Sequence, residues 1–412
     1  MSNHRPDRNA KAGNPQKRRG IRRRDLLLSG SSLVAAAAVL PRFMDADEFL
    51  PVPVAALPRG GSLDSQVESW MEKKSVPGLA ACIVKQDEVV WSKGYGMANM
   101  TKSIPFTPDT LFQIASISKV VTATAVMQLR DRRLLRLDDD IGTFLKFPVR
   151  NPAYPDKPIT FKHLLTHTSS IEDSAALGAS YAAGDPTLSM GEVVSQYFTP
   201  KRSFWGRGKY GANAPGAKES YSNAGFALLG YLVEVIGRQP LEDYLQQNVY
   251  GVLGMDETSF YIAKLDRDRQ ACPYTYAKKL TSNLCPGDGD GNLLPEGVSP
   301  KVGYNEHALY SYPTLADGMV RTSVNQLAKF LIALMNGDAR LLGTETLSEM
   351  LGDKEQGLGW YKIGDQWGHD GSDPGCSTEM IFDPETRIGS IVFANADAEL
   401  DEVRPLLMAE AA

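Results

Sequence analysis

The chain has 412 residues, of which 42% are hydrophobic and 23% are charged, and its formal net charge at pH 7 is −5. These values are typical of a globular protein and leave ample chain for a large core, in one composite domain or in two. The acidic balance argues against nucleic-acid binding, and the body of the chain has no apolar run as long as the roughly 18 residues that a membrane span needs.

The first elements in the chain are a basic arm and a short apolar segment. Residues 1–24 are polar and basic, and Arg22-Arg23-Arg24-Asp25 leads into an apolar stretch that ends at Leu40. Two arginines, one free position and then leucines resemble a twin-arginine export signal. The alternative is a basic arm before a weak membrane anchor, but Pro41 and the acidic residues at 45–48 argue against a long anchor.

Small residues at Val54-Ala55-Ala56 fit a cleavage site, although they lie far from Leu40. We therefore predict that residues 1–56 are a signal and leader, that the twin-arginine machinery exports the protein, and that it is periplasmic or secreted with no stable membrane span after signal removal. The removed segment has 10 Lys and Arg against 5 Asp and Glu, so the remainder would have 34 basic and 44 acidic residues and a net charge of −10. The basic arm is thus interpreted as a targeting element, and no nucleic-acid partner is expected.

The rest of the chain, residues 57–412, predicts one composite α/β domain. Alternating and apolar patterns predict paired strands at 79–84 and 89–95, with further strands near Ile381 and at 391–394. Helical periodicity predicts helices at 118–129, 224–236 and 325–335. The stretches 172–220 and 272–313 have weak periodicity and are expected to be loops that frame a cleft. Strands at both ends predict an α/β lobe of about 57–110 plus 320–412, with an inserted, mainly helical lobe of about 111–319.

Ser116-Ile117-Ser118-Lys119 places a hydroxyl and an amine one helical turn apart, where a strand-like segment becomes a helix. Residues at i and i+3 share a helix face, so Lys119 can reach the Ser116 oxygen. A lysine desolvated by apolar neighbours can lose its charge and act as the base that a serine nucleophile needs. The alternative is a buried structural lysine, but no other serine in the chain has a lysine three places on.

Two further motifs contain polar groups suited to a site. Tyr221-Ser222-Asn223 is the only Tyr-x-Asn in the chain and stands at the start of an apolar helix. A phenol can transfer a proton while a carboxamide holds a substrate, although helix capping would also explain the pair. The segment from Trp367 to Ser372 is polar and glycine-rich, and precedes a strand-like run at 377–382. Glycine there allows close backbone approach to a ligand.

The four cysteines have no metal-binding spacing, and no metal or cofactor is predicted. Cys82 and Cys376 lie in apolar surroundings and are interpreted as buried thiols, whereas Cys272 and Cys285 could form a disulfide in the periplasm. The acidic segment from Gly287 to Asn292 lacks the glycine and glutamate of an EF-hand loop and is interpreted as an exposed turn.

The ordered set Ser-x-x-Lys, Tyr-x-Asn and His-x-Gly resembles the serine β-lactamase and penicillin-binding-protein superfamily, in particular the class C-like branch of esterases, D-amino-acid peptidases and DD-carboxypeptidases. Further segments look like landmarks of this family in the family's order, and the resemblance covers about residues 60–400. These segments are Lys93-Gly94-Tyr95-Gly96, Pro108-Asp109-Thr110-Leu111-Phe112, Leu164-Leu165-Thr166-His167-Thr168-Ser169, Leu253-Gly254-Met255 and Gly357-Leu358-Gly359-Trp360. The resemblance implies a β-lactamase/transpeptidase-like fold, with an antiparallel sheet flanked by helices and the site in a cleft.

The resemblance also implies roles. Ser116 would be the acylated nucleophile, Lys119 its proton partner, and Tyr221 the relay to the leaving group, while Asn223 would orient the substrate. The backbone N–H groups of Ser116 and Ser372 would form an oxyanion hole. Whether lysine or tyrosine is the general base stays open. His163 and His167 lie in a phrase interpreted as a structural turn.

Departures from the family pattern bear on the substrate. His369 and Asp370 stand where β-lactamases and DD-peptidases usually have lysine and a hydroxyl residue, and Gly371 and Ser372 follow them. A neutral histidine suits a substrate carboxylate poorly, and Asp370 would repel an anion if it faced the site. We therefore expect an exported serine hydrolase of small uncharged esters, with other esters, amides or peptides as further substrates. The alternatives are a DD-carboxypeptidase or β-lactamase acting on cell-wall peptides or β-lactams, and a non-catalytic penicillin-binding-like protein.

Overall fold

The computed structural model describes residues 61–205, 209–279, 301–352, 356–363 and 365–411. Three expectations depend on residues outside these ranges: the signal and leader in residues 1–56, the pairing of Cys272 with Cys285, of which Cys285 lies outside, and the turn from Gly287 to Asn292. In the described part, Cys82 and Cys376 are buried thiols, as expected.

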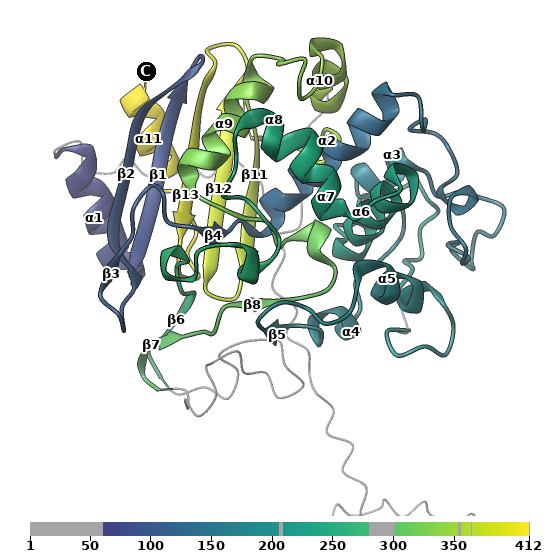
Figure 1. Ribbon diagram of the computed structural model, residues 1–412, viewed down its shortest axis with the longest axis horizontal. Helices are drawn as coiled ribbons and strands as arrows, with labels where there is room; N and C mark the ends of the chain where they lie inside the picture. Colours follow the sequence, from purple (N-terminus) through teal and green to yellow (C-terminus); the bar gives the residue numbers. More distant parts are fainter. Residues whose placement is uncertain (1–60, 206–208, 280–300, 353–355, 364, 412) are drawn as a thin grey trace, which may run out of the picture. The chain divides into compact units, whose positions relative to one another are not determined.

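A seven-stranded antiparallel sheet is the main layer of the described structure (Figure 1). The strand order is β10-β11-β12-β13-β1-β2-β3, so strands from the two ends of the chain pair at the centre, where Cys82 lies opposite Ile391. The predicted strands lie within this sheet, and the predicted α/β class with an antiparallel sheet is confirmed. The strands are β1 (Gly78–Lys85), β2 (Glu88–Asn99), β3 (Ile104–Pro105), β10 (Tyr361–Ile363), β11 (Gln366–Asp373), β12 (Cys376–Asp383) and β13 (Ile388–Ala394).

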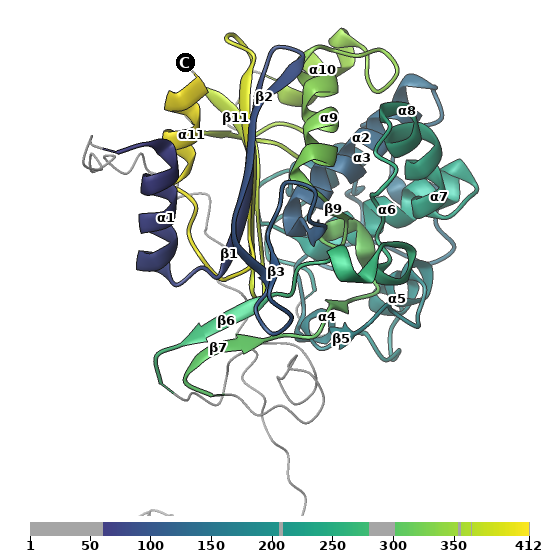
Figure 2. The ribbon, with the colours of Figure 1, turned by 60° about the vertical axis from the view of Figure 1, so that its left-hand side comes forward.

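Helices cover both faces of the sheet, as Figure 2 shows. Helices α1 (Leu63–Lys74) and α11 (Arg404–Ala411) lie on one side, and α9 (Val324–Met335) lies on the other with the inserted helices. Because successive strand residues point to opposite faces, β1 supplies both cores. Its alternate residues divide between the two hydrophobic clusters: Leu79, Ala81 and Ile83 on the α1 side, and Ala80, Cys82 and Val84 on the α9 side.

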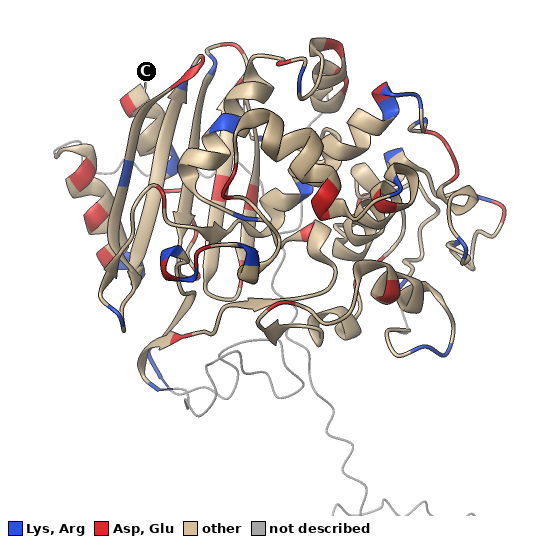
Figure 3. Ribbon diagram, in the orientation of Figure 1, with Lys and Arg blue, Asp and Glu red and all other residues tan. Residues whose placement is uncertain are grey.

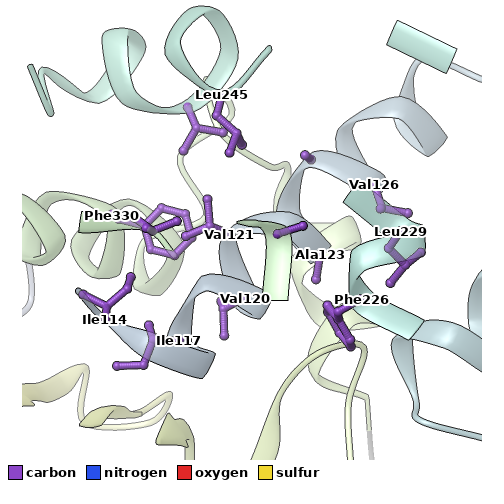
Figure 4. Close-up of a cluster of buried hydrophobic side chains, with 14 of the residues drawn as sticks. Ile114, Ile117, Val120, Val121, Ala123, Val126, Phe226, Leu229, Leu245 and Phe330 are labelled. Atoms are coloured by element: carbon purple, nitrogen blue, oxygen red, sulfur yellow. The ribbon is translucent and has the colours of Figure 1, made fainter. Parts of the chain in front are cut away.

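The inserted lobe is built around two apolar helices, α2 (Ser118–Asp131) and α6 (Asn223–Gly237). Twelve residues of α2 are buried, from Ser118 to Leu129, so this helix is enclosed on all sides. Figure 4 shows Val120, Ala123 and Val126 of α2 on the side of Phe226 and Leu229 from α6. This packing puts the start of each helix at the same place, next to the sheet. The smaller elements are α3 (Phe161–Leu165), α4 (Ala175–Gly178), α5 (Met190–Phe198), α7 (Leu241–Leu245), η4 (Gln246–Tyr250), α8 (Gly251–Leu253), α10 (Thr344–Leu351), η3 (Ile141–Thr143), η5 (Ile262–Lys264), η6 (Arg267–Arg269) and η7 (Leu315–Asp317), with two-stranded pairs β4 (Phe112–Gln113) with β9 (Arg321–Thr322), β5 (Ala182–Ala183) with β8 (Tyr310–Ser311), and β6 (Tyr274–Ala277) with β7 (Gly303–Glu306).

The stretches expected to be loops contain regular structure in part. Helix α5 lies in the first of them and begins with a capping box, in which the Ser189 side chain accepts from the Glu192 backbone N–H and the Glu192 carboxylate accepts from the Ser189 N–H. Val193, Val194 and Tyr197 then bury its apolar face. The Ser-x-x-Glu signal for this helix is present in the sequence, and the expectation of a loop there is wrong. No helix in the described part of the chain combines the length and the apolar character that crossing a membrane requires.

Candidate active site

Ser116 lies in a single helical turn, η2 (Ala115–Ile117), between β4 and α2. Ala115 has a φ of 44°, in the left-handed region that residues with a side chain rarely adopt. The turn is held on both sides, because Ile114 donates its N–H to the Val320 carbonyl at 2.9 Å and accepts from Thr378 Oγ1 at 2.8 Å. Ala115 and Ile117 are buried while Ser116 is only half-buried, so the hydroxyl is the polar group that the turn presents.

The Lys119 amine is completely buried and contacts three oxygen atoms. Its Nζ lies 2.9 Å from Ser116 Oγ, 2.8 Å from Asn223 Oδ1 and 2.6 Å from the Asp317 carbonyl oxygen. These three acceptors match the three donors of an ammonium group. Burial nevertheless lowers the pKa of Lys119 to about 8, against the opposing effect of nearby carboxyl groups led by that of Asp317. The amine can therefore exchange a proton with Ser116 near neutral pH.

Tyr221 packs against a histidine and the lysine. Its ring stacks on His167 with 4.3 Å between centroids, and Lys119 Nζ lies 4.9 Å from the Tyr221 centroid. Burial raises the pKa of Tyr221 well above its usual value, while a side-chain hydrogen bond with Ser116 opposes that rise. The phenol therefore stays protonated and can donate to an oxygen or nitrogen at Ser116.

His163 and His167 have the structural roles expected of them. His163 completes the capping box of α3, with Thr160. His167 accepts from the Ser222 N–H through Nδ1 at 3.0 Å, and so fixes the backbone beside Tyr221. Burial keeps the pKa of His167 well below its usual value, with the Lys119 charge as a second cause, so the ring is neutral.

Strand β11 runs against the turn that holds Ser116. A Cβ added at Gly371 would lie 2.6 Å from the Ile114 carbonyl oxygen and 3.0 Å from Ala115 Cβ, so only glycine permits this approach. Ser372 follows on the exposed face of the strand. The sequence pattern does not predict a strand at 366–373. The glycines and charged residues of this segment hide the alternation typical of a strand, and its pairing with β10 and β12 gives it the strand conformation.

His369 and Asp370 point to opposite faces of β11. His369 is 2% exposed, its Nδ1 lies 2.6 Å from the Asp370 carbonyl oxygen, and burial lowers its pKa to about 4. Its Nε2 has no hydrogen-bond partner among the described residues. The Asp370 side chain is 59% exposed and lies across the strand pair from Glu379, which binds Arg404 of α11. Strand alternation puts the Asp370 side chain on the exposed face of β11, with its Oδ1 4.0 Å from His369 Nδ1. The Asp370 charge still acts on Lys119, after those of Asp317, Asp173 and Asp373, so the repulsion expected from a site-facing Asp370 is reduced to a longer-range effect.

Other acidic groups surround Lys119, and no sequence motif predicts them. Asp317 and Asp373 are both buried, and burial raises the pKa of each to about 7. Asp173 binds the backbone and side chain of Asn223. No local spacing connects these aspartates with Ser116, so only the folded chain brings them to the site. Among the described residues, no group of three His, Cys, Asp or Glu side chains is arranged to hold a metal ion.

Comparisons with known proteins agree with this arrangement. A family model described as "Beta-lactamase" matches residues 63–412. Protein flp of Staphylococcus aureus (strain N315) is 25% identical over 347 residues, which cover 82% of this chain and 63% of that protein. The chain thus spans less than two thirds of the length of that relative.

Two solved structures show a similar fold. The octameric penicillin-binding protein homologue from Pyrococcus abyssi has a TM-score of 0.68 and 26% identity, and the match covers 85% of this chain and 76% of that one. D-amino acid amidase from Ochrobactrum anthropi SV3, complexed with D-phenylalanine, has a TM-score of 0.68 and 22% identity, with 85% and 98% covered. These likenesses confirm the β-lactamase/transpeptidase-like fold that the motifs predicted.

Proposed function

The chain belongs to the β-lactamase family, and we propose that it is an exported serine hydrolase that cleaves small uncharged esters or amides through an acyl-enzyme on Ser116. The observation that carries the proposal is the buried Lys119 amine, 2.9 Å from the Ser116 hydroxyl. A non-catalytic binding protein would have no use for a desolvated amine held against a half-exposed hydroxyl. The hydrolase neighbours in the fold comparison support the reaction class.

The acylation step follows from the geometry. Neutral Lys119 takes the proton from Ser116 as its oxygen attacks the substrate carbonyl carbon. The backbone N–H groups of Ser116 and Ser372 are the donors proposed for the oxyanion, where fixed dipoles stabilise charge that appears only in the transition state. Tyr221 relays that proton from Lys119 to the leaving group: it gives its own hydroxyl proton and takes up the one that Lys119 holds, so that the phenol and the neutral amine are both restored. Water then releases the acyl group by the reverse transfers, and Ser116 regains its proton. Lys119 is the better base of the pair, because burial makes a Tyr221 phenolate costly.

The preference for uncharged substrates rests on the charges around Lys119. The side chain at position 369 is a neutral imidazole, and the carboxyl groups of Asp173, Asp317 and Asp373 all act on the lysine. A substrate carboxylate would meet these groups without a fixed cation at position 369. Each lost attraction or added repulsion is worth on the order of 1 kcal/mol in a partly desolvated cleft.

A hydrolysis screen tests the reaction and the preference together. Purified protein is assayed with short-chain p-nitrophenyl esters, amino-acid amides, D-alanyl peptides and nitrocefin, with Ser116→Ala as the blank. We expect turnover of the esters to exceed that of nitrocefin, and a fluorophosphonate probe to form one adduct, on Ser116. Labelling at another residue, or turnover unchanged in Ser116→Ala, would refute the acyl-enzyme.

A matched pair of variants tests the role of position 369. His369→Lys supplies a cation and should raise kcat/KM for nitrocefin relative to a p-nitrophenyl ester. Asp370→Thr changes a charge on the opposite face of β11 and should leave that ratio unchanged. An unchanged ratio in His369→Lys would show that this position does not set the preference.

Export is proposed from the basic arm alone. Arg23→Lys combined with Arg24→Lys should leave active enzyme in the cytoplasm, because the twin-arginine pathway reads the arginine pair. Fractionation of cells that express the full chain measures this. Normal amounts of the double variant outside the cytoplasm would show that the signal was misinterpreted.

A further inference from the structure

The carboxylate of Asp173 receives hydrogen bonds from the start of α6. Its Oδ1 accepts from the Ala224 N–H at 2.8 Å, and its Oδ2 accepts from the Asn223 N–H at 3.1 Å and from Asn223 Nδ2 at 2.8 Å. Ser222 Oγ lies 3.4 Å from Oδ1. Asp173 is 50 residues away in the sequence, so this contact belongs to the tertiary structure.

Capping of α6 does not by itself account for Asp173. The N-cap of this helix is Ser222, whose own Oγ accepts from the Gly225 N–H at 2.9 Å. Asp173 accepts from the two backbone N–H groups that precede Gly225, those of Asn223 and Ala224, and in addition from the side-chain amide of Asn223. That last contact does nothing for the helix, because it ends on a side chain.

The contact with the side chain determines which way the Asn223 amide points. Its Nδ2 can only donate and its Oδ1 can only accept, and the first is directed at the Asp173 carboxylate. The Oδ1 atom is therefore directed at Lys119, 2.8 Å from Nζ. The flipped amide would place an oxygen against the carboxylate and N–H donors against the ammonium group, so both contacts would be repulsive.

We propose that Asp173 is a positioning residue for acylation, which orients Asn223 so that Asn223 and the Asp317 carbonyl hold the Lys119 amine against Ser116. This inference rests on the proposed function of Ser116 and Lys119. Asp173 touches neither the nucleophile nor a substrate, and it acts through Asn223. The negative charge of Asp173 also favours the protonated form of Lys119.

The charges that act on Lys119 set the direction of the expected pH effect. Asp317 of η7, Asp173 after α3, and Asp373 and Asp370 of β11 all raise the pKa of Lys119, while burial lowers it. The neighbouring rings of His167 and His369 are neutral. Removing the Asp173 charge makes the lysine lose its proton more readily. The acid limb of the pH–rate profile, in which the acylation rate rises with pH, must therefore move to lower pH.

The test compares Asp173→Ala and Asp173→Asn with a matched helix cap elsewhere. Glu192 caps α5 through the Ser189 N–H at 2.8 Å, so Glu192→Ala and Glu192→Gln remove a comparable cap. For each full-length variant, the second-order rate of fluorophosphonate labelling is measured from pH 5 to 10 and referred to the folded fraction, and the melting temperature is recorded.

We expect Asp173→Ala to label about 100-fold more slowly at its plateau, the size of loss that a misplaced catalytic group produces. Asp173→Asn keeps an acceptor for Asn223 and should recover part of that rate, with its acid limb at lower pH than in the wild type. The Glu192 variants should keep the wild-type rate and limb, whatever their melting temperatures.

A structural role alone predicts a different result, namely lower melting temperatures with the wild-type rate and limb in both Asp173 variants. That outcome would overturn the inference. If Asp173→Ala does not fold, the test rests on Asp173→Asn: the pH of its acid limb and its plateau labelling rate are compared with those of the wild type. Failure of the proposed function is separate, because it would appear as labelling of Ser116→Ala at the wild-type rate.

Discussion

Raising the pH from 6 to 9 should accelerate acylation of Ser116, because the reacting form of Lys119 is the neutral amine. Burial lowers the pKa of this lysine from 10.5 to about 8. A shift of that size corresponds to about 3 kcal/mol and raises the neutral fraction at pH 7 from roughly 3 in 10,000 to roughly one in ten, a gain of about 300-fold. The rate should increase about tenfold for each pH unit below 8 and level off above about 9.

Stopped-flow acylation by a p-nitrophenyl ester, or labelling by a fluorophosphonate, gives the rate at each pH, with Ser116→Ala subtracted as the background. Lys119→Met keeps most of the volume and removes the base, so its slow residual rate should not depend on pH in this range. A wild-type midpoint near 10.5 would show that the amine is not desolvated in solution. A limb near 8 that persists in Lys119→Met would show that another group titrates.

Three further changes test other parts of the structure. Tyr221→Phe should reduce kcat/KM roughly 100-fold or more for an amide but less for a p-nitrophenyl ester, whose leaving group needs no proton, and equal losses for the two substrates would contradict a relay by Tyr221. Gly371→Ala should abolish acylation, because the added Cβ would collide with the Ile114 carbonyl oxygen. Gly343→Ala is the control and should keep the wild-type rate, because a Cβ at Gly343 would have no atom within 4 Å. Activity in Gly371→Ala would show that β11 lies further from Ser116. The pKa of Asp373 is raised to about 7, so in the wild type the free energy of unfolding falls as the pH rises from about 4 through 7. Asp373→Asn should remove this loss, so that between pH 5 and pH 8 its free energy of unfolding in urea gains on the order of a few kcal/mol relative to the wild type. A difference that stays constant with pH would contradict the burial of the Asp373 charge.

The sequence by itself contains the features of this protein that depend on local spacing. Three residues along a helix bring Lys119 back over Ser116, whatever surrounds them, because the helical repeat places i and i+3 on one face. The burial of β1 and α2 can also be predicted from their own residues, because a segment that is enclosed on both faces has apolar residues throughout. The β-lactamase/transpeptidase-like fold could therefore be predicted from the motifs and their order.

The tertiary structure decided which way side chains point and which residues far apart in the sequence come into contact. The adjacent residues His369 and Asp370 look like one site in the sequence, but pairing in the sheet buries the first and turns the second to the opposite face. Strand β11 itself was not visible, because its polar and glycine residues gain a strand conformation only from hydrogen bonds to β10 and β12.

The chemistry of Lys119 is the sharpest example of this division. Its distance from Ser116 follows from helix geometry, but its lowered pKa requires that α6 and η7 cover it, and the orientation of Asn223 requires Asp173 from a different part of the chain. Desolvation and the field of several charges depend on everything within a few ångströms of an atom, and neighbours in space are not neighbours in sequence. The sequence therefore determined which groups could react, and only the tertiary structure decided how their protons are held.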